Sequence, residues 1–143
     1  MAQHKISGND YLLLISDDGG TTYDTVVCLT SNSITRSTNT IDANTKCGPD
    51  KLPGTQSNGV TFEGQIMLDP SGSTVSLDVL EDSWSAIDTI YWKMAPVSPV
   101  TGDITYTGTG FISKLDEVFA QDAPGTFSDK IGVYGTITKA VTA

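Results

Sequence analysis

The stretch from Ile15 to Ser31, ISDDGGTTYDTVVCLTS, decides between two kinds of fold. Its spacing of serine, aspartate, glycine and threonine matches the Asp-box, a turn motif of sialidase-type β-propellers, except that Tyr23 stands where tryptophan is usual. The same residues predict a tight β-hairpin turn, because Asp18-Gly19-Gly20 lies between two apolar runs. The stretch is therefore either part of a propeller blade or a well-built turn in another kind of β protein.

The length of the chain favours the turn. A propeller needs several blades of four strands, and its sequence repeats at a fixed period. The chain has 143 residues, enough for about one domain, and it holds no second copy of the motif and no other internal repeat. We therefore interpret residues 1–143 as a single domain, with residues 1–9 as a loose N-terminal segment.

The composition predicts a globular β protein. Hydrophobic residues make up 38% of the chain and charged residues 17%, which excludes a disordered chain. Fourteen glycines and many threonines, serines and valines favour strands and turns over helices. The apolar runs are too short to cross a membrane, and the N-terminus has no apolar signal region, so we expect neither membrane insertion nor secretion.

The charge and the reactive residues exclude several function classes. A net charge of −9 would repel duplex DNA, so a groove-binding protein is excluded. The one histidine, His4, lies in the loose N-terminal segment, and neither a nucleotide-binding motif nor a metal-ligand cluster is present. We expect no enzymatic activity, no cofactor and no metal. Cys28 and Cys47 could pair, although free thiols are more usual in an unsecreted chain.

Most of the chain predicts antiparallel strands. The segment from Val60 alternates cleanly, with Val60 and Phe62 on one face and Thr61 and Glu63 on the other. The first two predicted strands form a hairpin, and the last two are joined by a turn at Asp122–Gly125. The predicted strands are Asp10–Ser16, Thr22–Thr30, Ser33–Ile41, Val60–Asp69, Thr89–Ala95, Asp103–Leu115 and Thr126–Lys139, with a turn at Pro70–Ser73.

Two segments depart from the strand pattern. Thr74–Ala86 has an apolar stripe with acidic residues opposite, which predicts a helix capped by Ser73 or Thr74. We expect Trp84, on this helix, and Trp92, in a strand, to pack in the core. Residues 43–59 contain Gly48-Pro49 and Pro53-Gly54 and show no periodicity, so we expect a long loop. Loops of this length are usually functional or lie at an interface.

The order of these elements resembles the major tail protein, or tail tube protein, of long-tailed bacteriophages and gene transfer agents. The resemblance runs from about residue 10 to residue 140. It is carried by the hairpin DDGGTTYDTVVCLTS, the polar strand ITRSTNTID, the Pro53-Gly54 segment before GVTFEGQIMLD, and the strand ITYTGTGFISKLD. The family resemblance implies an antiparallel β-sandwich or barrel with one flanking helix, about residues 74–86, and a long loop at 43–59.

The resemblance also implies an assembly. Members form hexameric rings that stack into a hollow tube, through which DNA passes into the host without specific binding. The implied partners are further copies of the chain, the tape measure, the tail terminator and the distal tail or baseplate. The implied location is the virion, with the host cytoplasm during assembly. The long loop would contact neighbouring subunits or rings through Lys46, Asp50, Lys51, Leu52, Pro53 and Gln56.

One sheet of each subunit would line the channel. A cationic channel wall would hold phosphates, whereas an acidic or neutral, hydroxyl-lined wall leaves DNA mobile. The polar faces of three strands fit such a wall, although Phe111 and Lys130 depart from it. The candidates for facing the lumen are Thr61, Glu63, Gln65, Thr105, Thr107, Lys130 and Thr136.

Two other function classes stay open on the sequence. One is a carbohydrate-binding or adhesin-like β-sandwich that uses Trp84, Trp92 and the tyrosines as its platform. The other is a fragment of a hydrolase. Electron microscopy of the purified protein would separate them, since a tube subunit forms rings or tubes.

Overall fold

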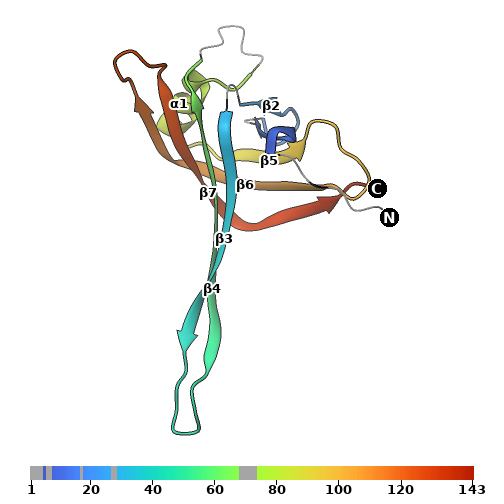
Figure 1. Ribbon diagram of the computed structural model, residues 1–143, viewed down its shortest axis with the longest axis vertical. Helices are drawn as coiled ribbons and strands as arrows, with labels where there is room; N and C mark the ends of the chain where they lie inside the picture. The colour runs from blue at the N-terminus through green and yellow to red at the C-terminus, as the bar shows by residue number, and fades with distance from the viewer. Residues whose placement is uncertain (1–4, 6–7, 17, 27–28, 68–73) are drawn as a thin grey trace.

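The computed structural model describes residues 5, 8–16, 18–26, 29–67 and 74–143. A short 3-10 turn, η1 (Gly8–Asp10), leads into a single antiparallel sheet of seven strands with one helix (Figure 1). The elements that follow are β1 (Tyr11–Ser16), β2 (Asp24–Thr25), β3 (Leu29–Asp42), β4 (Lys51–Gln65), α1 (Leu77–Ala86), β5 (Ile90–Pro96), β6 (Ile104–Val118) and β7 (Thr126–Val141). The predicted mainly-β fold with one flanking helix is confirmed.

The strand order is β2-β1-β5-β6-β7-β4-β3. The sheet curls, so that its two ends approach each other: Asn32 on β3 donates its side-chain N–H to the backbone oxygen of Tyr11 on β1, at 3.3 Å. Arg36, also on β3, lies over the ring of Tyr106 on β6. The concave face of this curled sheet, here called the core face, encloses the hydrophobic core and is covered by α1.

The core is apolar and continuous. Its buried side chains come from five strands, from the helix and from Val26 and Val75, and the largest of the fully buried ones are Trp92, Phe62, Leu13, Leu80, Ile90, Ile131 and Val60. The alternation predicted on β4 is confirmed, since Val60 and Phe62 are buried while Glu63 and Gln65 are exposed. Burial of Trp92 is also confirmed.

The predicted long loop at 43–59 is wrong. Residues from Lys51 onward belong to β4, which pairs with β3 as far as Asp42, so only residues 43–50 connect the strands. Pro53 is tolerated because this part of β4 has β3 on one side only, and a free strand edge needs no backbone N–H. A register shift between Thr38 and Thr40 accommodates the Pro53-Gly54 pair.

The opening hairpin is shorter than predicted. Strand β2 covers only Asp24–Thr25 of the predicted Thr22–Thr30 segment. Val26 is then buried, donates its backbone N–H to the oxygen of Leu13 on β1 at 3.1 Å, and bridges Val75 just before the helix. Strand β3 begins at Leu29, earlier than the predicted Ser33, and includes the predicted polar strand.

The helix also differs from the prediction. It begins at Leu77, with Ser76 at the N-cap and no side-chain capping bond, so Thr74 is not its cap. Ile87, in the left-handed conformation, ends it. Trp84 is 52% exposed, so its predicted core position is wrong, because Ser83 occupies the buried side of the last turn.

The remaining strands follow the prediction closely. Strands β5 and β6 begin one residue after the predicted starts, at Ile90 and Ile104, β7 begins at Thr126 as predicted, and β6 and β7 extend to Val118 and Val141. Asp122 in the predicted turn between them is in the left-handed region, with φ of 59°. Of the predicted loose segment 1–9, residues 1–4, 6 and 7 lie outside the described residues, as do the turn at residues 70–73 and Cys28, while Cys47 is an exposed free thiol.

Candidate functional site

A long two-stranded hairpin projects from the body of the molecule (Figure 1). We call it the arm and define it as residues 36–58. Strand β7 pairs with β4 only from Gly59 to Gln65, so beyond that point β3 and β4 have no third strand. The residues of β3 and β4 in the arm are exposed, apart from the partly buried Gly54 and Asn58.

The end of the arm is built by specific hydrogen bonds. The backbone N–H of Ala43 bonds to the oxygen of Asp50 at 2.9 Å, and that of Asp50 bonds to the side-chain oxygen of Asn44 at 3.1 Å. Thr45 and Gly48 exchange two backbone bonds. The connection is therefore a defined turn that presents its outward side chains in fixed places.

The six predicted contact residues all lie on the arm and are exposed, five on its outer half and Gln56 nearer its base, opposite Thr38. Two lie in the connection and four on β4: Lys46, Asp50, Lys51, Leu52, Pro53 and Gln56. Sequence reasoning missed Ile41, which is the register partner of Leu52. The two side chains are 52% and 50% exposed and form an apolar spot near the end of the arm.

The second feature is the face of the sheet opposite the core, here called the outer face. Thr61, Glu63 and Gln65 alternate with buried residues of β4 and therefore lie on it, and Lys130 is the register partner of Thr61. Gly59, Gly132 and Phe111 are partners across three strands, which places Thr105 and Thr107 of β6 on the same face. Thr136 lies in an irregular part of β7 without a register partner.

The charges on the outer face nearly balance. At its paired positions the charged side chains are Lys93, Lys114, Lys130, Glu63 and Asp116. Three lysines stand against two acids, and between them lie many threonines and serines. The face is thus nearly neutral and rich in hydroxyl groups.

Phe111 on this face has a structural reason. Its ring covers Gly132 on β7, where an added Cβ would come within 2.9 Å of the ring, and it contacts Tyr134 with ring centroids 5.4 Å apart. A large aromatic ring over a glycine restores packing that the glycine cannot provide. The pair forms an apolar spot on an otherwise polar face.

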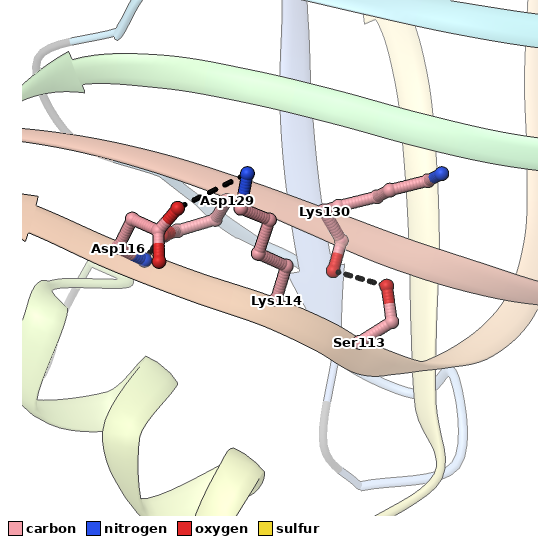
Figure 2. Close-up of polar contacts among 5 residues, drawn as sticks. All are labelled: Ser113, Lys114, Asp116, Asp129 and Lys130. Atoms are coloured by element: carbon pink, nitrogen blue, oxygen red, sulfur yellow. Dashed lines mark hydrogen bonds and ion pairs between the residues drawn. The ribbon is translucent and has the colours of Figure 1, made fainter.

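Strands β6 and β7 are irregular beside the two lysines (Figure 2). Ser113 is an extra residue in the register, and its hydroxyl donates to the backbone oxygen of Lys130 at 3.2 Å. Lys114 forms an ion pair with Asp116 at 3.1 Å, both side chains being more than half exposed. Such an exposed pair contributes little to stability.

Asp129, next to this irregularity, is on the core face between Phe62 and Leu115. It is 1% exposed, and its Oδ2 atom has no hydrogen-bond partner in the described structure. Its Oδ1 accepts the backbone N–H of Asp116 at 3.3 Å. Burial raises the pKa of the Asp129 carboxyl to about 7, although the hydrogen bond from Asp116 opposes this. The sequence signal for its burial was its position two residues from both Phe127 and Ile131, which places all three on the same face of the strand.

The turn after β1 is held by its own side chains. The hydroxyl of Ser16 donates to Asp18 at 2.6 Å, and the same carboxylate accepts the backbone N–H groups of Thr21 and Thr22 at 3.1 and 2.9 Å. The bond from Ser16 is the largest cause that lowers the pKa of Asp18. The Asp-box spacing therefore builds a turn, as predicted.

Within the described ranges no group of three or more histidine, cysteine, aspartate or glutamate residues is placed to hold a metal ion, and no described helix is long and apolar enough to span a bilayer. The sugar-binding alternative required Trp92 as part of its platform, and Trp92 is fully buried.

Comparisons with known proteins now add to this geometry. The sequence profile of the phage tail tube protein family matches residues 5–139. No curated protein matches significantly.

Solved structures share the fold at low identity. The tail of a gene transfer agent particle, refined with C6 symmetry, aligns at 15% identity and a TM-score of 0.75, over 97% of this chain and 100% of that one. The SPP1 tail tube aligns at 15% identity and a TM-score of 0.78, over 96% and 80%. The sheath–tube complex of an extracellular contractile injection system aligns at 15% identity and a TM-score of 0.67, over 98% and 94%.

Proposed function

The chain belongs to the phage tail tube protein family and is a tube subunit, and we propose that six copies form a ring and that the rings stack into a channel for the genome. The observation that carries the proposal is the arm, an exposed two-stranded hairpin with an apolar spot near its end. An isolated two-stranded hairpin is marginally stable in water. A neighbouring copy that covers the arm would stabilise it.

The ring is inferred from similarity and from the edges of the sheet. The gene transfer agent tail has C6 symmetry, and its chain aligns over its whole length with this fold. Strand β3 is an edge strand of 14 residues, and such an edge offers unpaired N–H and C=O groups to a further strand. Pairing along β3 would join subunits side by side.

The outer face is the proposed channel wall. Its seven proposed lumen residues are Thr61, Glu63, Gln65, Thr105, Thr107, Lys130 and Thr136. The near balance of lysines and acids supports this assignment, because a strongly cationic wall would bind phosphates through counterion release. DNA would pass without specific binding.

The role is structural rather than enzymatic. Further partners would be a tape measure, a terminator and a distal tail or baseplate protein. Similar chains occur in structures described as a tube terminator and as a baseplate. The protein would reside in the virion, after assembly in the host cytoplasm.

Assembly is tested with the purified chain. Size-exclusion chromatography with light scattering, over a rising concentration, should show rings or longer polymers, and negative-stain microscopy should show their sixfold shape. A strict monomer at high concentration, with no polymer even beside a tail initiator complex, would refute the proposal.

The arm is tested separately. Replacing residues 39–55 by Asn-Gly joins Thr38 to Gln56, which are register partners, through a two-residue hairpin turn. The subunit should keep its melting temperature, because the removed residues contribute nothing to the buried core, while polymers should shorten or vanish. If the polymers are unchanged, the arm does not contribute to the interface between subunits.

A further inference from the structure

A groove between α1 and β6 is a second surface with no partner among the described residues. It has a volume of about 230 Å³ and is lined by Glu81, Trp84 and Ser85 of the helix and by Leu115 and Glu117 of the strand. Trp84 is the half-exposed wall of this groove, although tryptophan is among the largest apolar side chains. The groove is thus partly apolar and open to solvent.

The carboxylates of Glu81 and Glu117, which line the groove, repel each other. Burial and the nearby Glu81 both raise the pKa of Glu117, and the two carboxyls share a hydrogen bond. The helix adds Asp78 and Asp82 and contains no lysine or arginine, while Lys114, further along β6, is paired with Asp116. An incoming ammonium group would relieve this repulsion.

The end of the arm carries apolar side chains and two lysines, together with Asp42, the register partner of Lys51, and Asp50. Leu52 and Ile41 form its apolar spot, and Lys51 is adjacent to Leu52. Lys46 lies in the connection, where the hydrogen-bonded turn holds the backbone. A lysine can lay its aliphatic stem along apolar surface while its ammonium group reaches a carboxylate.

The two surfaces lie at opposite ends of the molecule. Figure 1 shows the arm extending along the longest axis, with α1 near the other end. They cannot meet within one chain, but in copies translated along this axis the arm of one approaches the helix end of the next. A contact between two different surfaces is heterologous, and its repetition produces an open filament.

We propose that the end of the arm docks into the α1–β6 groove of the next copy, with Leu52 against Trp84 and with Lys51 and Lys46 beside Glu81 and Glu117. This proposal rests on the tube function and names the surface that receives the arm. The occupant is a second copy of this chain. Docking supplies apolar cover to Ile41, Leu52 and Trp84 and supplies cations to a groove that has none.

Charge reversal tests the pairing. Lys51→Glu and Glu81→Lys should each raise the concentration needed for polymerisation by about tenfold or more, because each places like charges opposite each other. The double variant restores the attraction with reversed sign and should polymerise within a few-fold of the wild type. Asp88→Lys, an equal charge change just beyond α1 and outside the groove, serves as the control. Melting temperatures check that each variant is folded.

Cross-linking tests the location independently of charge. Cys47 is an exposed native thiol in the arm connection, and Ser85→Cys places a second thiol in the groove. Oxidation of assembled Ser85→Cys protein should give a ladder of covalent oligomers, which disappears when Cys47→Ser is added. Ser113→Cys, on the far side of the sheet, should give no ladder.

The outcomes separate the two proposals. If the wild-type chain never polymerises, the tube function fails. If it forms tubes but the single charge reversals polymerise normally, or the double variant shows no recovery, or no ladder forms, the docking site is wrong while the tube function stands.

Discussion

Asp129 makes the stability of the subunit depend on pH in an unusual direction. Its carboxyl is 1% exposed, and burial raises its pKa from 3.8 to about 7. Between these two values the folded state keeps a proton that the unfolded state has lost. Stability is therefore greatest below about pH 4 as far as this group is concerned, falls as the pH rises, and changes no further once the pH exceeds about 7.

The magnitude follows from the two pKa values. One pH unit corresponds to 1.36 kcal/mol, so the loss between pH 4 and pH 7 has an upper limit of ~4 kcal/mol. This is a large fraction of the 5–15 kcal/mol typical of a whole domain. Asp129→Asn keeps the shape and the acceptor for the N–H of Asp116 but cannot ionise. It buries an amide at a cost of about 1–3 kcal/mol, so we expect it to be more stable than wild type by about 1–3 kcal/mol at pH 8.

Urea unfolding from pH 4.5 to pH 8.5 measures the effect. The wild type should lose stability across this range, whereas Asp129→Asn should show a much flatter profile. Glu117→Gln removes the neighbouring carboxyl, whose pKa is also raised, and so shows how much of the pH dependence of stability comes from Glu117. Equal slopes in wild type and Asp129→Asn, or a wild type that gains stability toward pH 8, would refute the assignment.

Three other changes test other parts of the molecule. Tubes of Glu63→Lys should assemble but eject DNA poorly, and higher salt should reduce the defect because screening shortens the interaction. Tubes of the control variant Asp88→Lys should eject DNA normally. Normal ejection by Glu63→Lys tubes would show that Glu63 does not line the channel wall. Gly110→Ala should destabilise the fold by about 1–3 kcal/mol or more, because its Cβ would overlap the backbone oxygen of Gly132; Gly8→Ala, with open space around it, is the thermal-unfolding control. Asp18→Ala should expose the Thr21 and Thr22 amides to hydrogen exchange and lower the melting temperature, and wild type should lose the same protection as the pH falls below 3.8, since the pKa of Asp18 is lowered.

The sequence predicted the elements whose local pattern and tertiary environment agree. Strands β5, β6 and β7 alternate strongly, and the hairpin turn after β1 carries its own hydrogen-bonding side chains. The lumen candidates of β4 were placed by the same alternation, since a strand with one buried face exposes the other. These features depend on near neighbours in the chain.

The features that the sequence did not predict depend on distant partners. Pro53-Gly54 indicates a loop locally, but pairing with β3, on the other side of the connection, makes the segment a strand. Asp129 alternates with Phe127 and Ile131, but a charged residue is rarely buried, and only the position of Phe62 and Leu115 on both sides places it in the core. Trp84 lies beside the apolar stripe of a ten-residue helix, whose buried side is completed by Ser83.

The net charge of −9 says little about the proposed channel wall. The outer face carries three lysines against two acids at its paired positions, so the excess of acid lies elsewhere. Part of it lies on α1, at Asp78, Glu81 and Asp82, on the side of the sheet opposite the wall. There it would repel like surfaces of unassembled subunits, and it would attract lysines such as those of the arm. In a tube built this way, total charge controls how subunits meet one another, and the passage of DNA depends on the few charges of a single sheet face.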